Sequence, residues 1–352
     1  MTDFSSPDSS KIDLRALTYE QMCELIESMS EKKFRAEQIF TWIHARNAVD
    51  FDVMSNVPSK LKEALRQNHY LSNLKPVKVL VSKIDGTRKY LFELDDGNII
   101  ESVLLKYEYG NTVCISSQVG CRMGCRFCAS TLDGLVRNLT AGEMVGQIYE
   151  IEKDINERVG HVVIMGSGEP LDNYDNLLNF ISIITHEKGR NLSGRNITAS
   201  TCGIVPQMLE LAKLKLPITL ALSLHAVTDE KRREIMPIAN RYSLNELFDA
   251  CKYYFDMTGR RMTLEYSLIA GQNDGPEDAD GLIRIGHMLN CHINLIPVNP
   301  IEERNFRSTA GDKVAAFKNK LEKNKINVTI RREMGRDIQG ACGQLRRRYS
   351  GE

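Results

Sequence analysis

The sequence predicts an α/β protein in which helices cover a parallel β-sheet, with a small helical domain and a β-hairpin segment in front of it. Three patterns in the chain lead to this prediction. Helical periodicity dominates residues 17–70, apolar and polar residues partly alternate over residues 77–117, and short apolar strands then alternate with helical stretches. Repeated βα units form parallel sheets whose active-site loops follow the carboxyl ends of the strands.

The first part of the chain is expected to form a helical accessory domain over residues 14–75. Helical patterns cover residues 17–29, 35–47 and 59–70. Ile39, Trp42 and Ile43 fall on one helical face, which indicates a buried side. The Ser-rich residues 1–13 are expected to be disordered.

Residues 76–112 are expected to form a β-hairpin extension. The turn signals Asp85-Gly86 and Asp96-Gly97 separate its apolar runs. Residues 113–333 are expected to form the catalytic α/β unit, and residues 334–352 a C-terminal active-site loop and tail.

The catalytic unit has a regular order of elements. Thr140-Ala-Gly-Glu143 is a capping box that begins a helix with Met144, Val145 and Ile148 along one face. Strand candidates lie at residues 161–165, 196–201, 218–224, 262–269, 292–297 and 327–331, and a helical stretch separates each pair.

Composition restricts the classes of function. The chain lacks a run of about 18 apolar residues and a signal-peptide pattern, so a cytoplasmic protein without a membrane span is expected. Nine cysteines in such a chain favour reduced, metal-binding or catalytic thiols. The net charge is zero, but residues 331–352 hold six arginines against three acids, a local patch that suits phosphate contacts. Nothing in the sequence demands more than a monomer.

The stretch Cys121-Arg-Met-Gly-Cys125-Arg-Phe-Cys128 is the strongest chemical signal. Structural zinc sites usually take four protein ligands, and the chain has no second CxxC or HxxxH pair. An iron-sulfur cluster held by three thiolates instead keeps one iron open for a substrate. Two alternatives stay open on spacing alone: buried structural cysteines, or a zinc site completed by Cys114.

Other candidate residues follow the predicted strands. Gly166-Ser-Gly-Glu-Pro170 comes directly after an apolar strand, so Glu169 could present its carboxylate to an ammonium group, although a plain turn is the alternative. Polar residues also end three further strands at Ser200, Ser223-Leu-His225 and Asn299. His225 is expected to line the pocket rather than to act as a catalyst.

Two further cysteines are candidate reactive thiols. Cys114 lies on the strand that leads into the cysteine stretch, and Cys342 lies between glycines near the C-terminus. Positive charge favours the thiolate, and Arg331, Arg332 and Arg336 are close to Cys342 in sequence. The alternative for Cys342 is an incidental cysteine in a tail. The remaining cysteines, Cys23, Cys202, Cys251 and Cys291, lie in apolar contexts typical of core.

Together these motifs resemble the RlmN/Cfr family of radical-SAM RNA methyltransferases. The matching segments are Cys114-Ile-Ser-Ser-Gln-Val-Gly-Cys121, the cysteine stretch, Arg137-Asn-Leu-Thr-Ala-Gly-Glu143, Met165-Gly-Ser-Gly-Glu-Pro170 and Ala341-Cys-Gly-Gln-Leu345. The segments from Phe34 to His44 and from Cys128 to Thr131 resemble the RlmN branch. The resemblance implies a partial parallel (β/α)6-type barrel. It also implies a 4Fe-4S cluster on Cys121, Cys125 and Cys128, and two molecules of S-adenosylmethionine (SAM) per turnover.

The resemblance further implies a mechanism. Cys342 would take a methyl group from one SAM, and a radical from the second SAM would remove hydrogen from S-methyl-Cys342. The resulting methylene radical would add to adenine, Glu101 would accept a proton, and Cys114 would resolve the protein-RNA adduct, leaving a transient disulfide with Cys342. The alternative for Glu101 is an exposed strand carboxylate. The implied SAM contacts are Gly168, Glu169, Ser200, Ser223, Leu224, His225 and Asn299.

The implied substrates are 23S rRNA, at one adenosine of the peptidyl-transferase centre, and tRNA, at the adenosine just 3′ of the anticodon. The helical domain would help to hold RNA, and a flavodoxin or ferredoxin system would reduce the cluster. Two rival functions stay open. One is Cfr-type methylation of carbon 8 of the same rRNA adenine instead of carbon 2. The other is a non-catalytic zinc-containing RNA-binding protein in which Cys114 joins the three loop cysteines.

Overall fold

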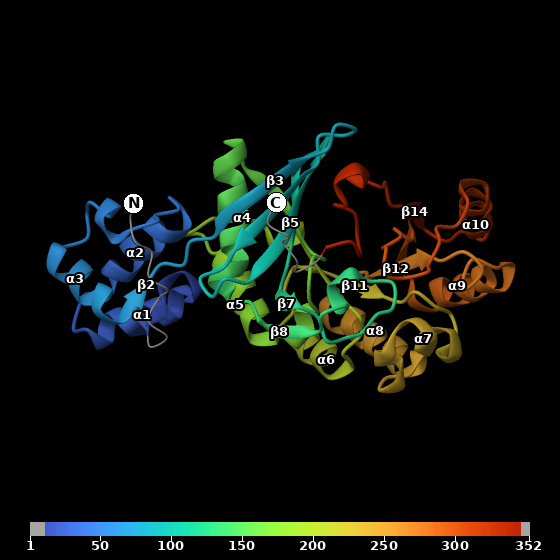
Figure 1. The fold of residues 1–352 in the computed structure, drawn as a ribbon. Helices are drawn as coiled ribbons and strands as arrows, with labels where there is room; N and C mark the ends of the chain where they lie inside the picture. Colours follow the sequence, from blue (N-terminus) through green and yellow to red (C-terminus); the bar gives the residue numbers. More distant parts are fainter. Residues whose placement is uncertain (1–10, 346–352) are drawn as a thin grey trace.

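One mixed sheet organises the fold in the computed structural model, which describes residues 11–345 (Figure 1). Its ten strands follow the order β14-β13-β12-β11-β10-β9-β6-β5-β4-β3. The parallel strands are β6 (Gly110–Ile115), β9 (Val159–Ile164), β10 (Ile197–Thr201), β11 (Thr219–Ser223), β12 (Thr263–Leu268), β13 (His292–Pro297) and β14 (Val328–Ile330). The predicted strand at residues 292–297 has the observed bounds, and four of the other predicted ranges each contain a shorter observed strand. The predicted range 161–165 is shifted, because β9 begins two residues earlier and ends one residue earlier.

Helices connect the parallel strands, as the βα order predicts. They are α4 (Ala141–Ile155), α5 (Tyr174–Thr185), α6 (Val205–Lys213), α7 (Asp229–Ile235), α8 (Leu244–Thr258), α9 (Pro276–Leu289) and α10 (Gly311–Lys323). Thr140 and Glu143 form the predicted capping box at the start of α4. Met144, Val145 and Ile148 are fully or almost fully buried, so this helix face is part of the main core.

The predicted hairpin extension is part of the same sheet. Strands β3 (Lys75–Val81), β4 (Arg88–Glu93) and β5 (Ile99–Tyr107) pair antiparallel, and β5 pairs antiparallel with β6. Gly86 and Gly97 have φ of +75° and +78° in the two predicted turns, a conformation that favours glycine. The predicted boundary between residues 112 and 113 falls inside β6. This strand closes the antiparallel part and begins the parallel part.

Helices α1 (Tyr19–Ser28), α2 (Phe34–His44) and α3 (Ser59–Asn68) lie together at one end of the molecule, opposite α9 and α10 (Figure 1). His44 links this group to the barrel, since its Nδ1 lies 3.1 Å from the Tyr149 hydroxyl on α4. Phe40 and His44 also pack closely around Gly189.

One part of the predicted disordered tail is ordered. β1 (Ile12–Asp13) pairs in parallel with β2 (His69–Tyr70). The buried Asp13 carboxylate accepts hydrogen bonds from the backbone N–H groups of Arg15 and Ser72, and these two bonds fix the segment. The rest of that predicted tail, residues 1–10, and residues 346–352 of the predicted C-terminal tail lie outside the described residues. Over residues 11–345, none of the helices has the length and apolar character that a bilayer span requires.

Candidate active site

The cysteine loop, residues 121–128, leaves the sheet through a small hairpin. β7 (Gln118–Gly120) pairs antiparallel with β8 (Leu135–Asn138), and the Cys121 N–H donates to the Gly134 carbonyl at 3.0 Å. Gly120 has φ of +78°, and a Cβ there would lie 1.9 Å from the Gly134 carbonyl oxygen. Only glycine therefore lets strands β7 and β8 approach each other this closely at the base of the cysteine loop.

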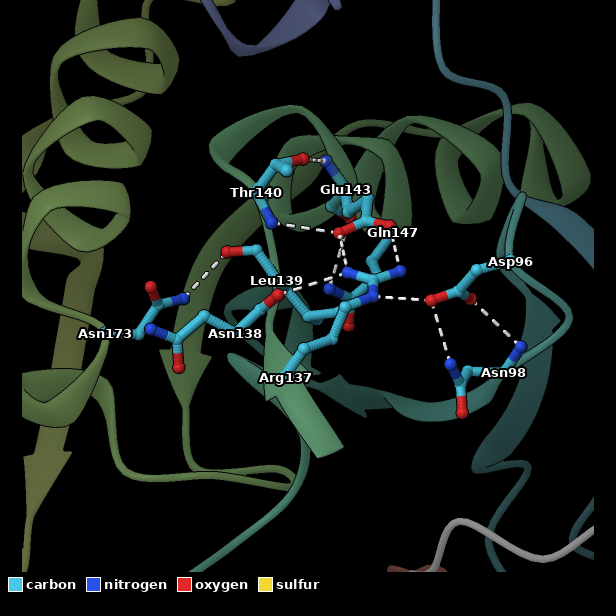
Figure 2. A network of polar contacts seen from close by, with 9 residues as sticks. All are labelled: Asp96, Asn98, Arg137, Asn138, Leu139, Thr140, Glu143, Gln147 and Asn173. Carbon is cyan, nitrogen blue, oxygen red and sulfur yellow. Dashed lines mark hydrogen bonds and ion pairs between the residues drawn. The ribbon is translucent and has the colours of Figure 1, made fainter. Parts of the chain in front are cut away.

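A polar network fixes the chain on both sides of that hairpin (Figure 2). Arg137 on β8 makes two 2.8 Å bonds to the Glu143 carboxylate on α4. The Gln147 side chain accepts from the Ser116 N–H at 2.8 Å and donates to the Ser116 carbonyl at 3.0 Å, directly after β6. Asn173 donates to the Leu139 carbonyl at 2.7 Å. The network thus ties β6, β8 and α4 to the segment that precedes α5.

The three cysteines of the loop line one cavity, which we call the cysteine cavity. It collects most of the predicted residues. Those that line it are Cys121, Cys125, Cys128, Gly168, Glu169, Ser200, Ser223, His225, Asn299 and Cys342. Burial raises the pKa of the Cys121 thiol to about 12 and also raises the pKa values of Cys125 and Cys128. These thiols therefore become thiolates near neutral pH only when a positively charged group such as a metal centre binds them.

The turn after β9 brings Glu169 to this cavity. A Cβ on Gly168, whose φ is +109°, would lie 2.7 Å from Gln118 Cβ, so glycine lets the turn pack against the end of the neighbouring strand. The buried Glu169 carboxylate accepts hydrogen bonds from the backbone N–H groups of Leu171 at 3.0 Å and Cys202 at 2.7 Å. Burial raises its pKa. Each oxygen keeps a second lone pair, so the carboxylate can still accept from an ammonium group.

The ends of β10, β11 and β12 supply polar groups from the opposite wall. The hydroxyl oxygens of Ser200 and Ser223 lie 3.4 Å apart. His225 Nδ1 accepts from the Ser267 N–H at 2.9 Å, which leaves the ring proton on Nε2. Burial lowers the pKa of His225 to about 3, so this ring is a neutral donor. Leu224 differs from its predicted neighbours, because its side chain is fully buried and lines neither this cavity nor the one beside Cys114.

The loop that carries Cys342 lies over the cysteine loop, and several hydrogen bonds to other parts of the chain hold it. Asn299 Nδ2 donates to the Cys342 carbonyl at 2.9 Å, and the Ala129 N–H donates to the Gly343 carbonyl at 2.7 Å. The Ser130 hydroxyl donates to the Leu345 carbonyl at 2.9 Å. Cys342 is therefore a fixed part of the cavity wall, which argues against an incidental cysteine in a tail.

A second cavity, the Cys114 pocket, adjoins the first. It is lined by Cys114 from β6 and shares Cys342, Arg331, Met165 and Asn299 with the cysteine cavity. Arg331 contributes the predicted positive charge, and Cys342, the first cause, together with Glu265 and Cys114 raises its pKa. Burial, the largest cause, and the nearby Cys342 together raise the pKa of Cys114 to about 12. One guanidinium thus lies within electrostatic reach of both candidate reactive thiols.

Glu101 lies on β5, and its side chain is buried, not exposed. Side chains alternate along a strand, so Glu101 shares its face with Val103, which lines the Cys114 pocket. Its Oε1 is 3.0 Å from Lys89 Nζ, which also donates to the Gln339 carbonyl of the C-terminal loop at 3.3 Å. Glu101 itself lines neither cavity.

Comparison with known proteins decides between the families that this geometry allows. The chain is 58% identical over 337 residues to the probable dual-specificity RNA methyltransferase RlmN of Lachnospira eligens, covering 96% of each chain. It belongs to the RlmN family. It is also 54% identical to the protein of the same description in Clostridium novyi, over 94% of this chain and 97% of that protein.

Domain models and a solved structure agree with membership of the RlmN family. Residues 12–71 match the ribosomal RNA large subunit methyltransferase N-terminal domain, and residues 115–283 match the radical SAM superfamily. A crystal structure of a radical SAM methyltransferase from Sphaerobacter thermophilus superposes with a TM-score of 0.90 at 40% identity. It covers 96% of this chain and 100% of that one. The predicted radical-SAM α/β fold is confirmed.

The RlmN family implies a 4Fe-4S cluster and SAM, and the cysteine cavity fits both. It brings three thiols, two serine hydroxyls and the Glu169 carboxylate to one space. Among residues 11–345, no group of three or more His, Cys, Asp or Glu is arranged to hold a metal ion. Four thiolates around one zinc lie within about 4 Å of one another. Cys114 lines the neighbouring Cys114 pocket and not the cysteine cavity, so the four cysteines of the alternative zinc site do not line one space.

Two findings differ from the sequence-based picture of an RlmN-family site. The nine cysteines all lie in the described range and are free, so the structure does not support a standing disulfide between Cys114 and Cys342, and the predicted disulfide is a transient one. Glu265 on β12 was not predicted, yet it lines the cysteine cavity. Its Oε1 accepts from Asn294 at 3.1 Å, its Oε2 is buried without a hydrogen-bond partner, and burial raises its pKa. In the sequence, the signal for Glu265 was its position as the single acid within the largely apolar strand β12.

Proposed function

We propose that this chain is a radical-SAM RNA methyltransferase that methylates carbon 2 of adenine in both 23S rRNA and tRNA. Membership of the RlmN family supports the reaction class, and the descriptions of its relatives support dual specificity. The single observation that carries the proposal is the position of Cys342. It lines the cysteine cavity and the Cys114 pocket at once, so one thiol faces both the cofactor side and the resolving thiol.

Cys342 is the methyl carrier in this proposal. Adenine carbon 2 is electron-poor and offers no lone pair, so it cannot attack the SAM methyl group directly. The Cys342 sulfur instead attacks the methyl carbon of SAM, so that a new S–CH₃ bond forms while the bond to the sulfonium sulfur breaks and S-adenosylhomocysteine leaves. The buried Arg331 guanidinium lies within electrostatic reach of this sulfur.

Cys121, Cys125 and Cys128 hold the 4Fe-4S cluster, while Glu169, Ser200 and Ser223 contribute polar contacts to SAM. When bound, the cluster supplies the electron that cleaves a second SAM and so provides the radical that takes one hydrogen from the Cys342 methyl group. Asn299 and His225 complete the contacts, and Leu224 contributes through its backbone.

The protein-RNA adduct is resolved by two groups on the antiparallel side of the sheet. The methylene radical adds to adenine carbon 2, and the adduct then loses one electron, which the oxidised cluster would take back, and one proton, which Glu101 accepts. The Oε1 of Glu101 lies 3.0 Å from Lys89 Nζ. The Cys114 sulfur then attacks the Cys342 sulfur, which releases the methylated adenine and leaves a Cys114–Cys342 disulfide. An external thiol or dithiol reduces that disulfide before the next turnover.

The helical domain, predicted to span residues 14–75, holds RNA in this proposal. Its match to an rRNA methyltransferase N-terminal domain supports that role. A flavodoxin or ferredoxin system supplies electrons, and the enzyme acts as a monomer in the cytoplasm.

Product analysis tests the proposal. RNA from a strain that lacks the modification is incubated without oxygen with the reconstituted protein, a reductant and methyl-labelled SAM. The RNA is then digested to nucleosides, which are separated and identified by mass spectrometry. Labelled 2-methyladenosine from both rRNA and tRNA is expected. Labelled 8-methyladenosine would assign the chain to Cfr-type chemistry, and no labelled adenosine despite full SAM cleavage would refute the substrate assignment.

A further inference from the structure

Arg232 on α7 is a buried cation in an unusual environment. Its side chain is completely inaccessible to solvent. Its Nε donates to the Leu224 carbonyl at 3.1 Å, and its Nη2 donates to the Cys202 carbonyl at 2.6 Å and the Ser223 carbonyl at 3.2 Å. Its Nη1 is buried and has no hydrogen-bond partner. Within the described residues, no carboxylate lies within salt-bridge distance of this guanidinium.

A buried guanidinium destabilises the folded protein unless a nearby anion compensates its charge. Removing a charge from water costs several kcal/mol per ion, and buried arginines are therefore normally paired. Asp229 on the same helix acts electrostatically on Arg232, but its Oδ1 accepts from the Leu244 N–H and it makes no salt bridge with the guanidinium. The described chain thus leaves the positive charge without a direct counter-ion.

The position of Arg232 indicates which anion it would meet. Its two carbonyl partners at Cys202 and Ser223 belong to residues that line the cysteine cavity. The cysteine loop is bonded to the same helix, since the Arg126 N–H donates to the Ile235 carbonyl at 2.9 Å. Arg232 does not itself line the cavity, so it lies behind the wall and acts through its field rather than by contact with SAM.

We propose that Arg232 is the counter-charge of the iron-sulfur cluster and raises its reduction potential. This inference rests on the proposed function, because it requires a cluster on the three loop cysteines. Reduction adds one electron from an external donor and so one negative charge to the cluster. A nearby buried guanidinium stabilises the reduced form more than the oxidised form, since their interaction is screened little by solvent. Arg232 is therefore a positioning and tuning residue, not a catalytic one.

The test is a reductive titration with dithionite of the fully loaded protein, followed by electron paramagnetic resonance. Iron and sulfide per chain are measured first. A wild-type protein that holds no cluster would contradict the proposed function itself. With the cluster present, Arg232→Gln is expected to lower the ratio of reduced to oxidised cluster at least tenfold at a fixed potential. This corresponds to a midpoint shift of about 59 mV for one electron.

Two further variants separate charge from structure. Arg233→Gln removes one positive charge from the exposed neighbouring position on α7 and should leave the midpoint unchanged. Arg232→Lys keeps the charge but cannot make the same three hydrogen bonds, and it should keep the midpoint close to that of the wild type. If Arg232→Gln fails to fold, the midpoint of Arg232→Lys still tests the inference. A shift in Arg232→Lys as large as that expected for charge loss would overturn the inference, as would an unshifted Arg232→Gln.

Discussion

The side chain of Asn299 holds the backbone of Cys342: its Nδ2 donates to the Cys342 carbonyl oxygen at 2.9 Å. The bond joins the second residue after β13 to a loop more than forty residues further along the chain. It orients the candidate methyl carrier at the boundary of the cysteine cavity and the Cys114 pocket. The position of the thiol therefore depends on the barrel, although the residue itself lies near the end of the sequence.

Asn299→Ala should slow methyl transfer to Cys342. A net hydrogen bond contributes about 1 kcal/mol, so its loss should lower the rate about fivefold. The rate is followed as the mass increase of the peptide that contains Cys342, at saturating SAM. Gln344→Ala is the matched control, because Gln344 bonds to the neighbouring Pro300 carbonyl and not to Cys342. Equal rates in both variants would show that the Asn299 bond does not position the carrier.

Cys114→Ala should stall the reaction as a covalent protein-RNA adduct. Without the resolving thiol the carbon bridge between Cys342 and adenine cannot be cleaved. The adduct appears as a ribonuclease-sensitive band of reduced mobility on a denaturing gel. Cys291→Ala, a substitution of a buried core cysteine in the loop between α9 and β13, should turn over without this band. Normal turnover by Cys114→Ala would show that Cys114 is not the resolving thiol.

Cys128→Ala should lose SAM cleavage, since the predicted cluster would lack a ligand. The control is Cys202→Ala in the same cavity, because Cys202 contributes its backbone N–H to Glu169 and is not a predicted ligand. Both proteins are reconstituted in parallel and assayed for iron and for 5′-deoxyadenosine. If Cys128→Ala keeps its iron and still cleaves SAM, Cys128 is not a cluster ligand. If Cys202→Ala loses both, the assignment of Cys202 as a non-ligand is wrong.

The docking of the helical domain should weaken at acidic pH through His44. Burial, the first cause, holds the pKa of His44 well below its usual value, so the folded protein keeps this ring neutral. The unfolded chain takes up the proton as the pH falls below about 6.5, and stability is lost there by up to about 1.4 kcal/mol per pH unit. Above this pH the two states bind equal numbers of protons, and the effect disappears.

Urea unfolding followed by fluorescence measures this effect. Trp42 is the only tryptophan and lies on α2 together with His44, so the signal reports on the helical domain. His44→Gln should flatten the dependence of stability on pH between about pH 5.5 and about pH 7.5. His287→Gln, at an exposed position on α9, should leave it as in the wild type. Identical slopes in the two variants would contradict the prediction.

Much of the site could be predicted because it lies where strands end. The cysteine stretch, the glycine-rich turn with Glu169, and the polar residues at Ser200 and Ser223 all follow apolar strands, and parallel strands bring such ends to one edge. Cys342 was predictable only from its motif. No local pattern shows that a residue after β14 returns to cover the cysteine loop.

Buried charges were the part that the sequence could not reveal. Arg232 lies in the segment Asp229-Glu-Lys-Arg-Arg-Glu-Ile235, whose high charge is typical of a solvent-exposed helix. Arg233 beside it is exposed, so composition alone cannot distinguish the two arginines. The β1–β2 pairing was missed for a related reason. Two residues have no periodicity, and the buried Asp13 fixes them through tertiary hydrogen bonds.

The most direct test of the central claim uses SAM whose methyl group carries three deuterium atoms. If Cys342 first carries the methyl group and then loses one deuterium as a methylene bridge forms, 2-methyladenosine should contain two deuterium atoms. The third hydrogen of its methyl group then comes from another source. Mass spectrometry of the product nucleoside reads this number. A product with all three deuterium atoms would mean direct transfer from SAM to adenine and would contradict the carrier role of Cys342.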